Sequence, residues 1–292
     1  MSKEIIDNKL FYKYQSIDEH FFENLSNNQL FFCDPTEFDA PVNYTTTLCR
    51  KGTEEEWIAY YMANRWEKDR IEKKIEENLK NGKSVKQGEE IVSYLDTNSG
   101  ILPRMCCLST RNDSALMWSH YANNHTGVCL CFKPTKSLCA DSRSGEINEI
   151  YRLTFGTELA ELMEVKYKDG CPGEVNILNM DRIKVGEQIL ECFLTKDSEW
   201  EYEKEYRMLS FKKYFHGEYV KKYEKNELEG IIFGLKIKRS DAQEIYDRVY
   251  EQYINEKKKV KFYRVKCIKD KYAMEIERIE DKDTKKYLES LQ

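Results

Sequence analysis

The sequence has few prolines and no long apolar run. Only 5 of its 292 residues are proline, so rigid linkers between domains are scarce, and we expect one compact body with insertions. No run of about 18 apolar residues is present, so no bilayer-spanning helix and no membrane partner are predicted. The first residues, MSKEIIDNKLFYKY, lack the apolar centre of a secretory signal. We therefore expect a cytoplasmic protein.

Several common ligand-binding motifs are also missing. The sequence contains neither Gly-x-Gly-x-x-Gly nor a Walker sequence, which are the glycine-rich loops that hold phosphates. Cys-x-x-Cys is absent, and His120 and His125 have no cysteine close by in sequence, so we predict no metal site. The net charge of −5 gives no reason to expect a nucleic acid as a ligand.

Ten cysteines are present, but their setting argues against a disulfide framework. Cys106, Cys107, Cys129 and Cys131 lie in apolar, strand-like runs, where a thiol behaves as a small hydrophobic side chain. The cytosol keeps such thiols reduced. We therefore expect all ten cysteines to be reduced.

The distribution of apolar and charged residues predicts the fold class. Hydrophobic residues make up 40% of the chain and charged residues 34%, which is typical of a globular protein with a highly charged surface. Strand-like and helix-like segments alternate irregularly and without an internal repeat. This pattern predicts an α+β fold with a mixed or antiparallel central sheet and flanking helices. We expect a single domain, residues 1–292, with a helical insertion at about 53–98.

The apolar periodicity assigns most segments to strands or helices. The expected strands are 9–16, 29–35, 104–110, 126–132, 160–169, 198–209, 228–237, 260–268 and 272–279. The expected helices lie within 16–32, 53–83, 114–122, 175–196 and 240–257. Thr53-x-x-Glu56 resembles a capping box at the start of the helix at 53–83. The charge-rich run from Glu67 to Lys83 predicts that the second half of this helix is exposed.

Residues 198–209, SEWEYEKEYRML, carry acidic residues at every second position. In a strand, Glu203, Glu205 and Arg207 would share one face, opposite aromatic residues. Close carboxylates repel one another, whereas a nearby guanidinium favours their ionised form. Such a group suits a general base or the oriented binding of a cation. The alternative is a solvated strand face that Arg207 neutralises, and a helix is also possible because β-branched residues are lacking.

A second candidate segment, 108–132, concentrates Ser109, Trp118, His120 and Tyr121. A helix over 114–122 would place His120 and Tyr121 on one side. His120 is a candidate general base or ligand-binding ring, and the alternative is a core histidine that bonds a carbonyl. A Ser–His pair from Ser109 or Ser119 lacks the support of a Gly-x-Ser-x-Gly turn.

The first strand and the turn after the second strand add further polar residues. Lys13 and Tyr14 stand in the run FYKYQS. Asp34 and Asp39 flank an Asp-Pro turn, where a structural role is the default because such turns usually serve the backbone.

The segments LFYKYQS, LFFCDPTEFDAP, CLSTRNDSALMWSHYANNHTGVCLCF, VKY, KDSEWEYEKEYRM and IIFG occur in the order seen in the bacterial domain of unknown function 2971 family. The chain resembles that family over nearly its whole length. The most specific pieces are the Met-Trp-x-His-Tyr run at 117–121 and the Trp-x-x-Glu-x-Glu-x-Arg run at 200–207. Where the family shows Phe-Asn-Asp-Pro, residues 38–41 read Phe-Asp-Ala-Pro, so one acidic residue has moved or is lost. The resemblance favours convergence of the two specific runs.

The order of the polar residues also resembles, more distantly, that of ADP-ribosyltransferase-like domains, which implies NAD as a cofactor. In this interpretation an aromatic wall stacks the nicotinamide, and a carboxylate stabilises the developing oxocarbenium ion. The first strand, however, has no histidine or arginine at the position that the analogy requires. The candidate catalytic residues are Glu205, Glu203 and His120, with Glu205 first. The candidate ligand-binding residues are Lys13, Tyr14, Ser109, Trp118, Tyr121 and Arg207.

Two functions from different classes follow from these residues. One is an NAD-dependent or other nucleotide-binding effector of bacterial defence or toxin type, with ADP-ribosyltransferase or glycohydrolase activity. The alternative is a non-catalytic ligand-sensing or protein-interaction module, in which the acidic strand is structural. A nucleotide-type small molecule is the expected partner, while a protein or nucleic-acid target is left open. A nucleic-acid hydrolase that uses His and a carboxylate is less favoured because of the net charge.

Overall fold

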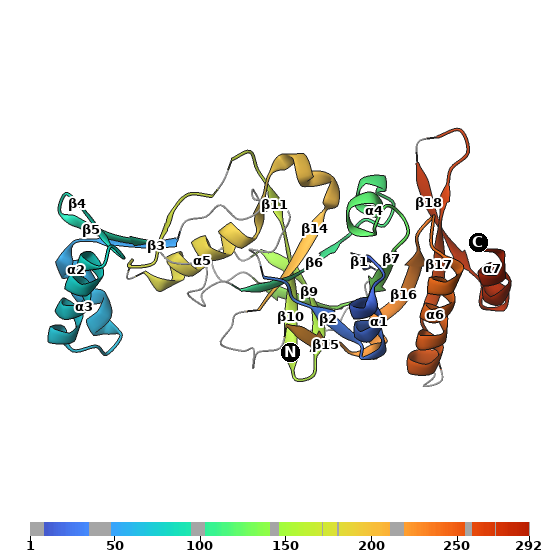
Figure 1. The fold of residues 1–292 in the computed structure, drawn as a ribbon, viewed down its shortest axis with the longest axis horizontal. Helices are drawn as coiled ribbons and strands as arrows, with labels where there is room; N and C mark the ends of the chain where they lie inside the picture. The colour runs from blue at the N-terminus through green and yellow to red at the C-terminus, as the bar shows by residue number, and fades with distance from the viewer. Residues whose placement is uncertain are drawn as a thin grey trace. The chain divides into compact units, whose positions relative to one another are not determined.

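The computed structural model describes residues 9–34, 48–94, 103–140, 146–170, 172–179, 181–210, 219–254, 259–271 and 273–291. The chain divides into two compact units (Figure 1). The first unit contains Met1–Cys33, Pro103–Val165 and Glu199–Gln292, and the second contains Asp34–Leu102 and Lys166–Ser198. The insertion expected at about 53–98 lies in the second unit, together with a later segment that the sequence did not associate with it. Whether the chain behaves as a single domain stays a prediction.

The first unit is built on a ten-stranded sheet with the order β18-β17-β16-β7-β1-β6-β14-β10-β9-β8. Neighbouring strands are antiparallel except for β16 and β17, which are parallel. The strands are β1 (Phe11–Gln15), β6 (Arg104–Ser109), β7 (Val128–Phe132), β8 (Thr135–Ala140), β9 (Ile147–Phe155), β10 (Glu158–Glu164), β14 (Glu205–Ser210), β16 (Leu228–Phe233), β17 (Lys261–Cys267) and β18 (Met274–Ile279). A mixed sheet with flanking helices confirms the predicted α+β class.

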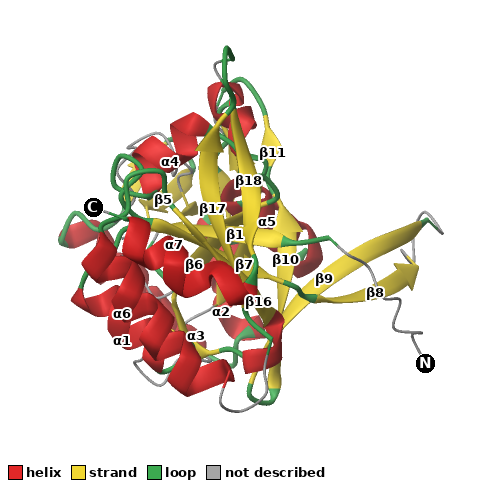
Figure 2. Cartoon of the chain, turned by 90° about the vertical axis from the view of Figure 1, so that its right-hand side faces the viewer, coloured by secondary structure: helices red, strands yellow, loops and turns green. Residues whose placement is uncertain are grey.

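Helices cover both faces of this sheet. The helices α1 (Glu19–Ser26) and α6 (Arg239–Val249) lie side by side on one face (Figure 2), and their apolar residues share a core with Phe11 and Leu130. The helix α4 (Ala115–Tyr121) packs Trp118 against Tyr14 and Cys129. Because side chains alternate along β1 and β7, these two cores lie on opposite faces. The central strand β7 is therefore buried along its whole length.

The remaining elements of the first unit are short. A π-helical turn (Tyr250–Ile254) continues α6, and α7 (Thr284–Ser290) ends the chain. The strands β2 (Gln29–Phe31) and β15 (Val220–Lys222) form a separate antiparallel pair beside α1. Within the described residues, 3₁₀ turns lie at Ser198–Glu203, Lys225–Glu227 and Asp281–Asp283.

The second unit has a small sheet and its own core. Its sheet order is β12-β3-β5-β4, and β11 and β13 form a second, parallel pair. The elements are β3 (Leu48–Gly52), α2 (Glu54–Ala63), α3 (Lys68–Lys80), β4 (Val85–Gln87), β5 (Glu90–Tyr94), β11 (Lys166–Tyr167), β12 (Val175–Asn176), α5 (Arg182–Phe193) and β13 (Thr195–Lys196). The core contains Trp57, Ile71, Ile75, Ile91 and Leu178.

The predicted features of the helical insertion are largely confirmed. Thr53 and Glu56 form the predicted capping box at the start of α2. Arg70, Lys73, Lys74 and Glu77, on the charge-rich second half, are exposed as predicted. The single helix expected over 53–83 is wrong, because the chain turns between α2 and α3, where Arg65 adopts a φ of +66°.

The prediction of one strand over 198–209 is wrong in its first half. Residues Ser198–Glu203 form a 3₁₀ turn, and β14 begins only at Glu205. Lys204 joins the two elements with a φ of +46°, which breaks the extended backbone. Glu203 therefore does not share the period-two face of Glu205 and Arg207. The lack of β-branched residues before Glu205 is consistent with this turn.

Two further expectations can be compared with the structure. The nine cysteines in the described part of the chain are free thiols, and Cys171 lies outside that part. Among the described helices, none combines the length and apolar character needed to cross a membrane.

Candidate functional site

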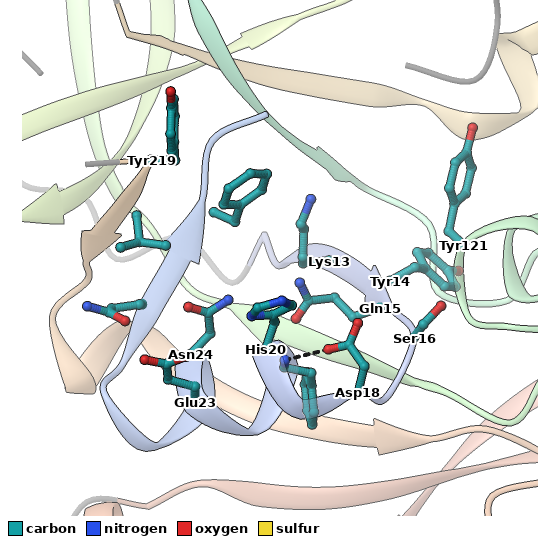
Figure 3. Close-up of a pocket in the computed structure, with 14 residues that line it drawn as sticks. Lys13, Tyr14, Gln15, Ser16, Asp18, His20, Glu23, Asn24, Tyr121 and Tyr219 are labelled. Atoms are coloured by element: carbon teal, nitrogen blue, oxygen red, sulfur yellow. Dashed lines mark hydrogen bonds between the residues drawn. The ribbon is translucent and has the colours of Figure 1, made fainter. Parts of the chain in front are cut away.

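A cavity of about 780 Å³ opens where β1 separates from its neighbour β6. β1 pairs with β7 from Phe11 to Gln15, but with β6 only at Tyr12 and Ser109. Residues 13–16 at the end of β1 line the cavity together with parts of α1, β2, β15 and α4 (Figure 3). All of these elements belong to the first unit.

Lys13 is the cation of this cavity. It is half-buried and has no hydrogen-bond or ion-pair partner in the described part of the chain. Burial lowers the pKa of Lys13 and the neighbouring acidic groups raise it, and the net direction is upward. Among these neighbours, the ion-paired carboxylate of Glu205 supplies negative charge, whereas burial raises the pKa of the Cys106 and Cys107 thiols. The ammonium group therefore remains charged at neutral pH.

Aromatic rings stand on both sides of Lys13. Figure 3 shows Tyr121 and Tyr219 at opposite ends of the cavity, with Lys13 between them. Phe31 also lines the cavity, and Phe31, Tyr121 and Tyr219 all remain more than a third exposed. The cavity thus combines a central lysine with exposed aromatic rings, and its lining also includes Asp18, His20 and Glu23.

Tyr121 connects the cavity to the acidic segment. Its hydroxyl donates a hydrogen bond of 2.6 Å to Oε1 of Glu203, which is only 2% exposed. Burial, reinforced by the charge of Glu203, raises the pKa of Tyr121 far above its usual value. The tyrosine hydroxyl is therefore protonated at any physiological pH and holds the carboxylate.

Ser109 fixes the backbone of Glu203. Its Oγ donates a hydrogen bond of 2.5 Å to the carbonyl oxygen of Glu203 and accepts one of 2.9 Å from the backbone N–H of Arg111. Ser109 is buried in β6. Its hydroxyl thus positions Glu203, and a contact with a ligand stays a prediction.

Glu205 and Arg207 form a buried, bidentate ion pair on β14. Nε of Arg207 donates to Oε1 of Glu205 at 2.7 Å, and Nη2 donates to Oε2 at 3.0 Å. The two residues are 5% and 3% exposed. The period-two spacing predicted this shared face, and neither residue of the pair lines the cavity.

Tyr14 and Trp118 join β1 to α4. Their rings meet edge to face with centroids 5.1 Å apart. The Tyr14 hydroxyl donates to the carbonyl oxygen of Arg111 at 3.0 Å, and Nε1 of Trp118 donates to the carbonyl oxygen of Asn112 at 2.8 Å. Both side chains therefore use their polar atoms inside the protein, although Tyr14 also lines the cavity.

His120 lies apart from the carboxylates. It is exposed on α4, and its ring centroid is 6.2 Å from that of Tyr121 and 6.3 Å from that of Trp200. It makes no hydrogen bond or ion pair within the described residues. The structure thus pairs Tyr121 with Glu203 and Glu205 with Arg207, but it pairs His120 with neither carboxylate.

A Ser–His contact near α4 involves Ser119, one of the two serines considered in the sequence analysis, and His125. Oγ of Ser119 lies 3.0 Å from Nε2 of His125 and also donates to the carbonyl oxygen of Ala115 at 2.9 Å. Nδ1 of His125 is buried and has no hydrogen-bond partner among the described residues, so no third group orients the ring. This contact fixes the turn after α4.

The sequence analysis missed the α1, β2 and β15 side of the cavity. Asn24, Phe31 and Tyr219 line it, but none belongs to a recognisable motif. The sequence did contain one signal for Phe31. In a strand over residues 30–32, side chains alternate between faces, so burial of Leu30 and Phe32 leaves Phe31 exposed. Asp39 and the Phe-Asp-Ala-Pro run at 38–41 lie outside the described residues.

The described residues contain no cluster of three or more His, Cys, Asp or Glu side chains able to hold a metal ion.

Comparisons with known proteins give a match to one family model over part of the chain. No curated protein and no solved structure matches the chain. Residues 117–208 match the model of a family described as protein of unknown function (DUF2971). The matched range contains Tyr121, Glu203, Glu205 and Arg207, and it includes both specific runs that the sequence analysis singled out. Over residues 117–208, the chain is similar to the DUF2971 family, which supports the predicted resemblance in that region.

Proposed function

We propose that the first unit binds a nucleotide-type small molecule in the cavity beside β1, with Lys13 binding its anionic group. The observation that carries this proposal is the charged, half-buried ammonium of Lys13, which faces the cavity without a hydrogen-bond or ion-pair partner among the described residues. An ammonium group removed from bulk water is stabilised by an anion such as a phosphate or carboxylate.

The walls of the cavity support a ligand with flat rings. Exposed aromatic side chains at both ends offer stacking surfaces to heterocyclic bases, and every base has a face that can stack on them. The volume of about 780 Å³ lies within the range of roughly 300–1,000 Å³ that is typical of small-molecule and cofactor sites. NAD, with two rings joined by a pyrophosphate, is the first candidate.

The state of the two candidate catalytic carboxylates, Glu203 and Glu205, favours binding over catalysis. Both oxygens of Glu205 accept hydrogen bonds from Arg207, and Glu203 accepts one from Tyr121. Both carboxylates are nearly fully buried and neither lines the cavity. A general base must reach the proton that it removes. We therefore propose a ligand-sensing module, which would suit an effector of bacterial defence or toxin type.

One observation favours an NAD-consuming enzyme as a second candidate. Tyr121 lines the cavity and donates its hydroxyl hydrogen to Glu203, so a carboxylate stands directly behind the cavity wall. If a ligand displaced Tyr121, Glu203 could stabilise positive charge on a ribose while nicotinamide leaves. Water or a target side chain would then attack the ribose carbon from which nicotinamide has left.

Thermal unfolding and calorimetric titration with NAD would test the proposal. We expect NAD to raise the melting temperature of the wild-type protein and of Lys222→Met, since Lys222 is an exposed residue of β15 that does not line the cavity. Lys13→Met should lose this effect. Chromatography of the same samples would detect released nicotinamide, which supports the enzyme, whereas binding without release supports the sensor.

Equal stabilisation of wild type and Lys13→Met by NAD would refute the role of Lys13. Absence of binding by NAD, ADP and AMP to the wild-type protein would refute nucleotide binding itself.

A further inference from the structure

We infer that Tyr219 and Arg104 form a base-stacking subsite for adenine at one end of the cavity, separate from the anion subsite at Lys13. The inference rests on the nucleotide binding proposed above and specifies the class of ligand as an adenine nucleotide.

The Tyr219 ring is supported from behind by a cation. Cζ of Arg104 lies 3.9 Å from the centroid of the Tyr219 ring, which is a close cation–π stack. The backbone is held as well, because the carbonyl oxygen of Tyr219 accepts a hydrogen bond of 2.7 Å from the N–H of Phe32. The ring therefore has a fixed orientation before a ligand arrives, which reduces the entropy lost on binding.

The same ring is open to the cavity. Tyr219 is 47% exposed and lines the cavity wall. The neighbouring Phe31 ring, with its centroid 6.3 Å away and tilted by 56°, widens the apolar surface. Tyr219 and Phe31 thus form an exposed aromatic pair beside the cavity, and the guanidinium of Arg104 covers the Tyr219 ring. Such a pair is suited to stacking a planar group of a ligand.

Amide side chains at this end of the cavity can read the edge of the base. Asn24 and Gln29 line the cavity, and their amide groups make no hydrogen bond within the described residues. Figure 3 shows Asn24 on the Tyr219 side of Lys13. The amide of Asn or Gln can pair with N6 and N7 of adenine, but the donor and acceptor pattern of guanine does not match it in the same way. These amides therefore favour adenine.

The two subsites predict separate responses to fragments of the ligand. Adenosine carries the base without a phosphate, pyrophosphate carries the charge without a base, and AMP carries both. We would titrate each into the full-length wild type, Tyr219→Ala and Lys13→Met by calorimetry. Tyr94→Ala serves as the matched control, because Tyr94 is also an exposed tyrosine but lies in the second unit.

We expect Tyr219→Ala to weaken AMP and adenosine binding by about 5-fold to 150-fold, the range for loss of one stacked base, and to leave pyrophosphate binding unchanged. Lys13→Met should show the reverse pattern, with pyrophosphate binding lost and adenosine binding retained. Tyr94→Ala should bind all three probes like the wild type. Asn24→Ala should reduce the preference for AMP over GMP.

Several results would overturn the inference. If Tyr219→Ala binds AMP as tightly as the wild type while Lys13→Met does not, the stacking subsite is wrong and nucleotide binding stands. If the wild type binds GMP as tightly as AMP, the assignment of adenine is wrong. If the wild type binds none of the probes, including NAD, both the inference and the proposed function are wrong.

Discussion

At the scale of single residues, the catalytic and the structural interpretation differ most sharply for Glu205, which forms a buried ion pair with Arg207. Glu205→Gln keeps the shape of the side chain and removes its charge, so the buried guanidinium loses the carboxylate with which it forms two hydrogen bonds. Breaking such a pair costs about 3–5 kcal/mol, and we expect the free energy of unfolding to fall by that amount. Urea unfolding would measure it.

Glu201→Gln is the matched control for this prediction. Glu201 forms an ion pair of 2.7 Å with Lys204, and both side chains are about half exposed. Exposed pairs contribute at most about 1 kcal/mol, so this variant should unfold almost like the wild type. If Glu205→Gln is as stable as Glu201→Gln but loses NAD binding or turnover, Glu205 acts on the ligand and the structural interpretation is wrong.

A second prediction at the scale of single residues concerns the hydroxyl of Tyr121. Tyr121→Phe removes a hydrogen-bond donor to the nearly buried carboxylate of Glu203. Hydrogen bonds to charged groups contribute about 1.5–3 kcal/mol, and we expect a loss of stability in that range. Tyr250→Phe should have no effect, since the exposed Tyr250 hydroxyl makes no hydrogen bond within the described residues. Equal melting temperatures for the two variants would contradict the prediction.

The sequence could predict the contacts of residues close together in the chain, but not those of distant ones. The spacing of Glu205 and Arg207 indicated a shared face, and the structure confirms their pairing. The bond from Tyr121 to Glu203 spans 82 positions and depends on how α4 packs, which no local pattern encodes. Tyr219 is held next to the cavity by the hydrogen bond from the N–H of Phe32 to its carbonyl oxygen. This contact also joins residues distant in sequence, so no local pattern could predict the position of Tyr219.

At the scale of elements, Gly127 fixes the distance between β7 and β1 next to the cavity. A Cβ atom at this position would lie 2.2 Å from the carbonyl oxygen of Gln15 and 3.0 Å from Cα of Ala122. Both are backbone atoms, so Gly127→Ala must displace β1 or the end of α4. Overpacking of this kind costs about 1–3 kcal/mol, and we expect at least that loss in urea unfolding.

Gly186→Ala is the control for steric conflict. Gly186 lies within α5, and a Cβ atom there would meet nothing within 4 Å. Alanine is favoured over glycine inside a helix by about 0.5–1 kcal/mol, so this variant should be slightly more stable than the wild type. A Gly127→Ala protein as stable as Gly186→Ala would show that β1 tolerates displacement.

Elements were predicted well where one pattern dominated and poorly where two competed. The apolar runs identified β6 and β7 close to their observed bounds, and the capping box identified the start of α2. In SEWEYEKEYRML the alternation of charges suggested a strand throughout, but the first residues fold as a 3₁₀ turn. The turn allows Glu203 to meet Tyr121, so a contact distant in sequence overrides the local pattern.

At the scale of the whole molecule, strand order was beyond prediction. The sheet places β1 between β7 and β6, more than 90 positions away in sequence, and the parallel pairing of β16 with β17 sits among antiparallel neighbours. The separation of β1 from β6 after Tyr12 opens the cavity. Sequence patterns indicate that strands exist but do not specify which edges meet, so they could nominate Lys13 without locating the cavity.

Glu227 links the stability of the first unit to pH. Its carboxylate is buried, and both oxygens accept from the backbone N–H of Thr154, at 2.9 and 3.0 Å. Burial raises the pKa of Glu227 from 4.5 to about 7, although the hydrogen bonds from Thr154 act in the opposite direction. Between these two values the folded protein binds more protons than the unfolded chain. Stability contributed by this group is therefore present below about pH 4.5 and is lost as the pH rises through 7.

Glu227→Gln removes the titration and keeps a carbonyl oxygen that can accept from Thr154. One pKa unit corresponds to about 1.4 kcal/mol, so the free energy of unfolding of the variant relative to the wild type should rise by roughly 2–3 kcal/mol between pH 5 and pH 8. Urea unfolding of both proteins at four pH values in this interval would measure the difference. Glu289→Gln, at an exposed glutamate of α7, should follow the wild-type curve throughout. A constant difference between wild type and Glu227→Gln across the interval would mean that Glu227 is ionised in the folded protein at pH 5, and that the hydrogen bonds from Thr154 outweigh its burial.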